Sequence, residues 1–277
     1  MVTGESGGLA ERLAPKGRVR QDETKDGPFA RQIALSNGLT FYLASRRMLG
    51  AIKFLRKEIF GRQRYYRSGF EIRPEDTIID IGANMGMFVM WAAPQAPRGR
   101  IVAIEPMDVV DSMDLNVRLN DLKNVTVLQA AVGKDGEELE FIDYPGFNIV
   151  SHKIGVRPAW TTRLLIGLLF FRYRADPVRM KAPCVSLGTI MDDLDLQTVN
   201  YLKIDCEGGE YEIFRNLAPE HWQRIERIAM EFHELEPGNR YSELVSLMES
   251  HGFHVEVRKP LLDYYFMKFG ELWARRL

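Results

Sequence analysis

Two short stretches of the sequence combine acidic residues with glycines directly after an apolar run. The first is Asp80-Ile81-Gly82-Ala83-Asn84-Met85-Gly86, which overlaps the end of the apolar run 77–81. Glycine allows backbone turns that other residues avoid and lets a ligand approach the main chain closely. A helix beginning after Gly86 would add free backbone N–H groups. The stretch therefore predicts a ligand-binding turn between a strand and a helix, where open α/β sheets bind nucleotide-like ligands.

The spacing of the glycines narrows the class of ligand. A dinucleotide-binding turn needs the pattern G-x-G-x-x-G. Here the glycines are Gly82 and Gly86, and Asn84 stands where that pattern has its second glycine. The spacing therefore disfavours a nicotinamide dehydrogenase. Asp80, placed before the turn, suits a cofactor with a positive amino group and a sulfonium instead.

Glu105 ends the next predicted strand, over 100–105. An acid at this position can accept charge-assisted hydrogen bonds from both hydroxyls of a ribose. A solvated acid at a strand end is the alternative for this residue taken alone. Together with Asp80 and Gly82 on the preceding strand, the ribose interpretation is favoured.

The second stretch is Lys203-Ile204-Asp205-Cys206-Glu207-Gly208-Gly209-Glu210, at the end of a predicted strand over 199–205. If the strand continues, Asp205 and Glu207 point to the same side of it. Capping of the following helix would account for one acid. Three acids in six residues are less easily explained in that way, so a catalytic role is predicted.

A histidine ends the following predicted strand, over 226–234. Glu231 and His233 share one side of this strand. Histidine is the usual general base near neutral pH. A purely structural histidine is the alternative, and the sequence alone leaves both open.

Strand-like and helix-like segments alternate from residue 75 onward, which predicts a parallel sheet with helices on both faces. Two final strands, over 254–258 and 263–269, are joined through Lys259-Pro260 and should pair antiparallel. A further antiparallel strand is predicted over 138–144. The remaining predicted strands are 77–81, 100–105, 125–130, 199–205 and 226–234, and the predicted helices are 87–96, 107–120, 209–218 and 240–251.

We predict two further parts before this alternating region. Residues 1–28 offer little to bury and should form a disordered or loosely docked tail. Residues 29–70 should form an N-terminal cap, with two short strands in 31–44 about Asn37-Gly38 and an amphipathic helix over 46–68. The main domain is then 71–277.

An insertion over 146–182 interrupts the main domain and is expected to be a lid or wall for the second substrate. Its apolar run, 164–171, is flanked by arginines and could pack on the core or make peripheral contact with a membrane.

The composition of the 277 residues sets broad limits. The net charge is −1, but residues 46–67 hold eight Lys or Arg against the single acid Glu58, a pattern that suits either a solvated face or an anionic partner. Two cysteines without a CxxC spacing argue against disulfides or structural zinc. No signal peptide or membrane-spanning run is apparent, so a cytoplasmic protein, with possible membrane association, is expected.

The acidic motifs resemble those of the FkbM family of methyltransferases: D-I-G-A-N-M-G, A-I-E-P, K-I-D-C-E-G-G-E and M-E-F-H, together covering most of the chain. Gly209 stands where the family usually has alanine. The resemblance implies a Rossmann-like class I methyltransferase fold, with a mostly parallel seven-stranded sheet ending in an antiparallel hairpin. It also implies S-adenosylmethionine as cofactor. By this resemblance the catalytic residues are His233, Asp205 and Glu207, and the cofactor-binding residues are Asp80, Gly82, Ala83, Asn84, Gly86, Glu105, Pro106, Ala130 and Ala131, the last two beside the adenine.

We therefore expect an S-adenosylmethionine-dependent O-methyltransferase acting on a hydroxyl of a sugar, glycolipid or secondary metabolite, with His233 or Asp205 as the base. Alternatives are an N-methyltransferase acting on a small molecule and a non-catalytic cofactor-binding protein. Nucleic acid is not an expected partner, because no continuous basic groove can be traced. A divalent metal is not expected, although hard oxygen ligands are available on Asp192, Asp193, Asp205 and Glu207, because their spacing forms no standard loop. The oligomeric state is left open.

Overall fold

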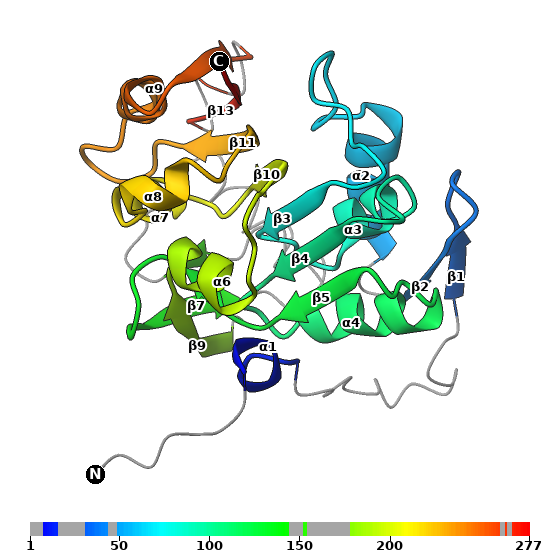
Figure 1. The fold of residues 1–277 in the computed structure, drawn as a ribbon. Coiled ribbons are helices and arrows are strands. Elements are labelled where there is room, and N and C mark those ends of the chain that lie inside the picture. Colours follow the sequence, from blue (N-terminus) through cyan, green and yellow to red (C-terminus); the bar gives the residue numbers. More distant parts are fainter. Residues whose placement is uncertain are drawn as a thin grey trace.

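The centre of the molecule is a twisted seven-stranded sheet (Figure 1). The computed structural model describes residues 8–15, 31–43, 49–143, 152–153, 178–260, 264 and 268–277. The strand order is β12-β13-β11-β10-β3-β4-β5. All neighbouring pairs from β11 to β5 are parallel, and β13 runs antiparallel to both β11 and β12. The strands are β3 (Thr77–Ile81), β4 (Arg100–Ile104), β5 (Val125–Leu128), β10 (Tyr201–Ile204), β11 (Arg227–His233), β12 (Phe253–Arg258) and β13 (Phe269–Arg276).

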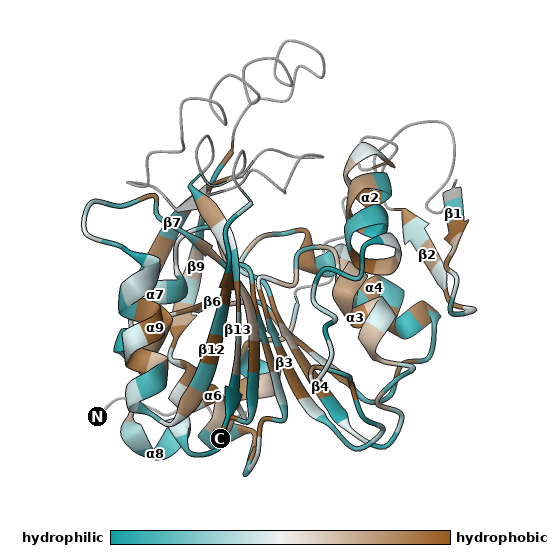
Figure 2. Cartoon of the chain, turned by 90° about the horizontal axis from the view of Figure 1, so that it is seen from above, coloured by the Kyte–Doolittle hydropathy of each residue, from teal (hydrophilic) through white to brown (hydrophobic). Residues whose placement is uncertain are grey.

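Helices cover both faces of this sheet, as the alternating pattern predicts (Figure 2). One face packs against α6 (Leu187–Asp193), α7 (Glu210–Arg215), α8 (Pro219–Trp222) and α9 (Tyr241–Ser250). The other packs against α3 (Met87–Ala92) and α4 (Val110–Leu119). The parallel strands consist mostly of apolar residues because both of their faces are buried. Charged residues within them, such as Asp80 and Lys203, are paired with each other. The predicted class I methyltransferase fold is therefore confirmed, and α6 and α8 are helices that the sequence analysis did not predict.

A second sheet has the order β6-β9-β7-β8. Its strands are β6 (Ala131–Val132), β7 (Glu138–Asp143), β8 (His152–Lys153) and β9 (Val178–Val185). The predicted antiparallel strand over 138–144 corresponds to β7, which pairs antiparallel with β9. The end of the predicted insertion thus belongs to this sheet. The apolar run 164–171 lies outside the described residues.

The last strand is not where the sequence pattern places it. The prediction of a strand over 263–269 is wrong, because β13 begins at Phe269. Tyr264 instead packs against Phe232 and Tyr241 beside the sheet. β13 contains the buried charge Glu271, which pairs with arginines distant in the sequence. A charged strand of this kind is not recognisable from local pattern alone.

The N-terminal region packs closely on the main domain. β1 (Arg31–Ala34) and β2 (Thr40–Leu43) form the predicted antiparallel pair. The predicted helix over 46–68 is shorter in the structure: α2 (Leu49–Arg56) continues as a π-helix, η2 (Lys57–Gly61), and the chain then turns. Among the helices of the described ranges, none has the length and apolarity needed to cross a bilayer.

Residues 8–15 are docked rather than disordered. They form α1 (Leu9–Arg12), and Leu9 is buried in the core on the α6–α9 face of the sheet. The backbone N–H of Gln129 donates to the carbonyl oxygen of Leu13. The disordered alternative for the tail is therefore wrong for this segment. The remainder of 1–28 lies outside the described residues.

Leu9→Ala is expected to lower the free energy of unfolding by about 2 kcal/mol, the low end for a buried leucine, because a short terminal helix can detach locally. Urea denaturation followed by circular dichroism measures this value. Glu11→Ala, on the exposed side of α1, is the control. Equal stability of the two variants would show that the segment contributes nothing to the fold.

Candidate active site

The turn between β3 and α3 is held against two neighbouring strands. The backbone N–H groups of Gly82 and Ala83 both donate to the carbonyl oxygen of Ile104, at 3.0 Å each. Gly82 has a φ of 73°, and a Cβ built on it would overlap the carbonyl oxygen of Asp205. Asn84 also takes a left-handed conformation, and Gly86, with a φ of 84°, precedes the first turn of α3. The glycine pattern is thus required by this turn.

Asp80, on β3, helps to hold this turn in place. It lies opposite Lys203 on the neighbouring strand β10, and its Oδ1 is 2.9 Å from the Lys203 Nζ. The same Nζ donates to the carbonyl oxygen of Gly82 at 3.0 Å. Because Asp80 is fully buried, its carboxylate does not line the surface of the turn. We therefore regard Asp80 as a residue that fixes the turn through Lys203.

Glu105 is held at the end of β4 by the same turn. Its Oε2 accepts the backbone N–H of Asn84 at 2.9 Å, and its Oε1 accepts that of Met107 at 3.0 Å. These bonds fix the orientation of the carboxylate beside the glycine turn. Its contact with a ribose stays a prediction.

The other predicted cofactor residues follow the ends of β3, β4 and β5. Ala83 is buried in a small cluster between α3 and α4, while Pro106 is half-buried. Ala130 is fully buried in the main core, and Ala131 begins β6. Their contact with an adenine is likewise a prediction.

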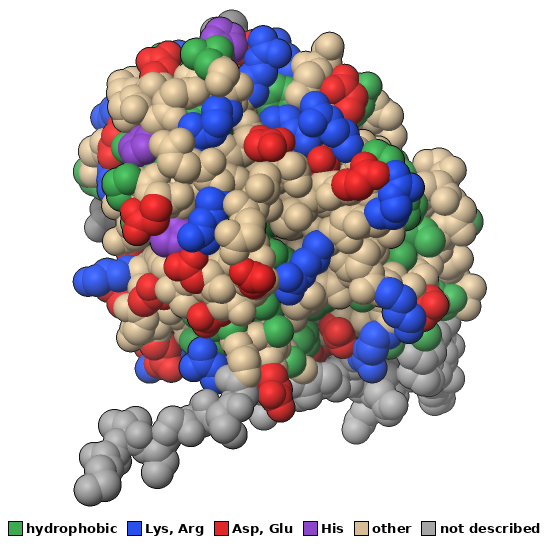
Figure 3. All heavy atoms as spheres, in the orientation of Figure 1, with side chains coloured by type: hydrophobic (Ala, Val, Ile, Leu, Met, Phe, Trp, Pro, Cys, Tyr) green, Lys and Arg blue, Asp and Glu red, His purple; other side chains and the backbone are tan. Residues whose placement is uncertain are grey.

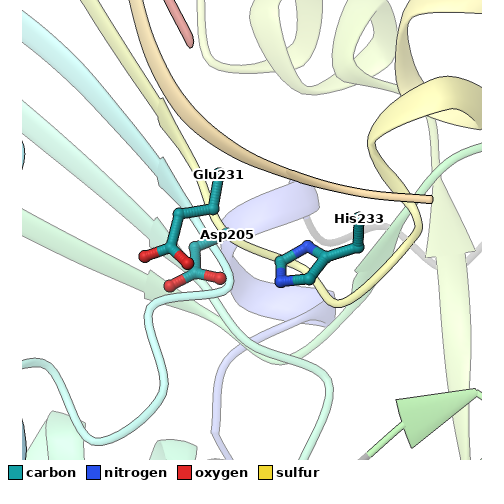
Figure 4. Close-up of side chains that lie close together, drawn as sticks. All are labelled: Asp205, Glu231 and His233. Atoms are coloured by element: carbon teal, nitrogen blue, oxygen red, sulfur yellow. The ribbon is translucent and has the colours of Figure 1, made fainter. Parts of the chain in front are cut away.

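The second acidic stretch brings its residues together at the ends of β10 and β11. Figure 4 shows the carboxylates of Asp205 and Glu231 side by side, with the ring of His233 facing them. One ligand-type atom from each lies within 4.8 Å of the others. His233 Nδ1 is 2.9 Å from Glu210 Oε1, and its Nε2 is 3.7 Å from Glu207 Oε2. Asp205, Glu207 and His233, predicted from the sequence, therefore form one group with Glu231 and Glu210.

The pKa shifts of these side chains indicate which of them are charged at neutral pH. Burial alone would lower the pKa of His233, but Glu207 and Glu210 outweigh it and raise the pKa to about 10. Burial likewise opposes ionisation of Asp205, yet Lys203 and His233 hold its pKa below the usual value. At neutral pH the site thus contains an imidazolium and an ionised Asp205.

Glu207 and Glu231 behave in the opposite way. Glu231 is almost entirely removed from water and Glu207 in part, and this loss of solvation, with the charge of Asp205, outweighs the pull of nearby cations on each. It raises the pKa of Glu207 to about 7 and that of Glu231 to about 8. Glu207 has a φ of 52°, in the left-handed region that non-glycine residues seldom adopt, and its side chain is 42% exposed. Such backbone strain concentrates at functional sites.

Three residues of this site were missed by the sequence analysis: Arg64, Tyr65 and Glu271. Arg64 and Tyr65 follow η2, in a part of the predicted helix over 46–68 that is not helical in the structure. Arg64 Nε lies 3.1 Å from Glu231 Oε1 and 3.0 Å from Glu271 Oε1. The only available signal was a concentration of arginines and tyrosines over 62–67.

The acids considered for a metal do not gather in one place. Asp192 pairs with His221 and Arg224, and Asp193 lies 3.8 Å from Arg12. The group of Asp205, Glu231 and His233 is already engaged by Tyr65, Arg64 and Glu210. We therefore describe it as an ion-pair and hydrogen-bond network. Independence from divalent metals stays a prediction.

Comparison with known proteins identifies the family. Residues 80–255 match the family described as the methyltransferase FkbM domain, which is more than half of the chain. The chain belongs to the FkbM methyltransferase family. Its enzyme class is therefore that of an S-adenosylmethionine-dependent methyltransferase, as the acidic motifs predict.

Similar proteins come from bacteria and fungi. The chain is 29% identical over 224 residues to the 31-O-demethyl-FK506 methyltransferase FkbM of Streptomyces tacrolimicus, covering 74% of this chain and 83% of that protein. It is 28% identical over 216 residues to Methyltransferase 1 of Beauveria bassiana, covering 76% and 84%. The crystal structure of an FkbM methyltransferase from Methylobacillus flagellatus is 15% identical, with a TM-score of 0.45, over 84% of this chain and 56% of that one.

The site fits the cofactor of this FkbM methyltransferase. A turn that tolerates no side chain at Gly82 brings main-chain groups to the sheet edge, with the fixed carboxylate of Glu105 beside it. The ionised Asp205 and the partly exposed Glu207 suit a cationic nucleoside. Gly82, Asn84, Gly86 and Glu105 would hold it, and it supplies an activated methyl group on a sulfonium.

Proposed function

We propose that this FkbM methyltransferase transfers a methyl group to a hydroxyl of a sugar, glycolipid or secondary metabolite, with Glu207 as the general base. One observation carries the proposal: Glu207 is a partly exposed carboxylate in a strained backbone conformation, with a pKa of about 7. A general base works best when its pKa lies near the working pH.

In this proposal the acceptor oxygen would give its proton to a Glu207 carboxylate oxygen as it takes the methyl group, while the methyl–sulfur bond breaks and S-adenosylhomocysteine is the leaving product. Asp205, which stays ionised, accepts a hydrogen bond from a second polar group of the acceptor, such as a neighbouring hydroxyl, and orients it. His233 keeps its proton and holds Glu207 and Glu210 on either side of its ring. The base role expected for His233 or Asp205 thus passes to Glu207, because neither has a pKa suited to accept a proton near pH 7.

The hydroxyl acceptor is favoured over an amine by a relative. The name of the Streptomyces protein describes O-methylation of a demethylated FK506. The absence of a nucleic-acid partner stays an expectation from the sequence. The face seen in Figure 3 carries basic and acidic side chains interspersed, without a continuous basic band.

The proposal predicts O-methylated products in an acceptor screen. Purified protein is incubated with S-adenosylmethionine and with 31-O-demethyl-FK506, simple glycosides, glycolipids and matched amines. Mass spectrometry detects S-adenosylhomocysteine and acceptors that gain one methyl group. Methylation of hydroxyl acceptors alone is expected. Products formed only on the amines would replace the proposal with N-methylation, and binding of S-adenosylhomocysteine without turnover of any acceptor would favour the non-catalytic alternative.

A further inference from the structure

A tyrosine from outside the FkbM-matched region reaches into the acidic group. Residues 62–70 follow η2 and end before β3, and the family match begins only at Asp80. The Tyr65 hydroxyl lies 2.8 Å from Asp205 Oδ2 and 3.1 Å from Glu231 Oε1. Tyr65 is buried, so these contacts are shielded from water. A hydroxyl from the N-terminal region therefore joins the ends of β10 and β11.

The position of Tyr65 is fixed from several sides. The Tyr201 hydroxyl donates to the Tyr65 carbonyl oxygen. The Tyr65 ring packs edge-on against Phe88, and the Lys203 Nζ lies 5.3 Å from its centroid. These contacts come from β10 and α3, so the ring cannot turn without disturbing both elements. The hydroxyl is thus held at one place by packing.

Arg64 anchors the same loop. Glu231 and Glu271 are direct partners across β11 and β13. Arg64 Nε lies between them, and Arg258 also pairs with Glu271. Because Arg64 contacts both carboxyl groups, the loop is tied to the sheet one residue before Tyr65.

The single proton of the Tyr65 hydroxyl determines which group donates and which accepts each hydrogen bond of this network. A tyrosine hydroxyl has one proton to donate and can also accept. The shorter contact, to the ionised Asp205, takes the proton. Glu231, whose pKa is raised to about 8, is protonated at neutral pH and can donate to the phenol oxygen. The result is a chain from Glu231 through Tyr65 to Asp205.

We propose that Tyr65 is a positioning residue for methyl transfer: its hydroxyl holds the Asp205 carboxylate in the orientation that binds the acceptor. This inference rests on the proposed role of Asp205 beside the acceptor. The charged or titratable groups that interact with Asp205 are Asp80, Lys203, Cys206, Glu207, Glu231, His233, Arg64 and Tyr65. Among these, Tyr65 and Arg64 lie outside the family match.

Tyr65→Phe tests the proposal, because it removes the hydroxyl and keeps the ring. Tyr66→Phe is the matched control, since Tyr66 is the adjacent tyrosine and is 43% exposed. In protein labelled with ¹³C at aspartate carboxyl groups, the Asp205 resonance is assigned with Asp205→Asn. Loss of a hydrogen bond to the charged form should raise the Asp205 titration midpoint by about one pH unit in Tyr65→Phe. Tyr66→Phe should leave it unchanged.

The affinity for S-adenosylhomocysteine and the turnover rate complete the test. Affinity for S-adenosylhomocysteine should change less than about threefold in Tyr65→Phe, while kcat with an acceptor found in the screen should fall about 10–100-fold. An unchanged Asp205 titration overturns the proposal, and so does a loss of rate that only parallels a loss of thermal stability. The titration needs no acceptor, so failure of the screen would refute the proposed function without deciding the role of Tyr65.

Discussion

Glu207→Gln is expected to lower kcat by about 10²–10⁴-fold, the usual contribution of a general base. Glutamine keeps the size of the side chain but accepts no proton at neutral pH. The wild-type kcat/KM should rise with pH through about 7, because Glu207 is active only when deprotonated and its pKa is about 7. The variant should lack this rise. Steady-state rates between about pH 5 and 9, with an acceptor from the screen, measure both effects.

The same substitution should not weaken the fold. Folding raises the pKa of Glu207, so the stability gained from its bound proton is present at low pH and is lost as the pH rises through about 7. Above that pH the carboxylate is crowded by other acids, and glutamine removes this repulsion. Glu207→Gln should therefore be at least as stable as the wild type at pH 8. A loss of activity at that pH would then have a chemical cause.

Glu220→Gln provides a matched control for this experiment. Glu220 lies on α8, which leads into the amino end of β11, opposite the site, and its side chain is exposed. It should retain wild-type rate and pH dependence. A wild-type rate in Glu207→Gln would refute its role as base. A similar loss in His233→Gln, with the rise in rate shifted to higher pH, would agree with a histidine that positions Glu207, because its positive charge lowers the pKa of Glu207.

The centre of the sheet could be predicted from sequence because its signals are local. Buried parallel strands appear as short apolar runs. The predicted strand over 77–81 coincides with β3, that over 100–105 is one residue longer than β4 at its end, and that over 226–234 is one residue longer than β11 at each end. The ends of these strands meet at one edge. Acids placed at their ends, such as Glu105 and Asp205, were therefore recognisable as site residues.

The parts that sequence reasoning missed depend on contacts between distant residues. Arg64 meets Glu271 across 207 positions of the chain, and the sequence around neither residue indicates this contact. The true last strand, β13, carries Glu271 inside it, whereas the aromatic segment before it has the higher strand propensity. Burial of the charge is stable only because Arg64 and Arg258 pair with it. No local rule contains that information.

The chemical role of His233 could not be predicted from its residue type alone. A histidine at a strand end suggests a base, since its ordinary pKa lies near neutrality. Its protonation in the fold is decided by Glu207 and Glu210, which raise its pKa to about 10. Residue type therefore located the site, and the arrangement of charges around it determined which group is suited to accept a proton.

Gly82→Ala is expected to weaken binding of S-adenosylhomocysteine by about 30–1,000-fold. A left-handed backbone alone costs an alanine about 1 kcal/mol. At Gly82 the added Cβ would also overlap the Asp205 carbonyl oxygen and lie 2.7 Å from the carbonyl carbon. Both atoms belong to the backbone, so the turn or the end of β10 must move. Such overpacking typically costs a further 1–3 kcal/mol or so.

Gly136→Ala separates the two contributions. Gly136 has a φ of 77°, close to the 73° of Gly82, but no atom lies within 4 Å of its built Cβ. It should lose only about 1 kcal/mol of stability and bind the product normally. Isothermal titration calorimetry with S-adenosylhomocysteine and urea denaturation measure the two quantities. Wild-type affinity in Gly82→Ala would mean that the turn does not hold the nucleoside. An equal loss of affinity in both variants would assign the effect to backbone strain. Of the two added Cβ atoms, only the one at Gly82 would meet the Asp205 backbone.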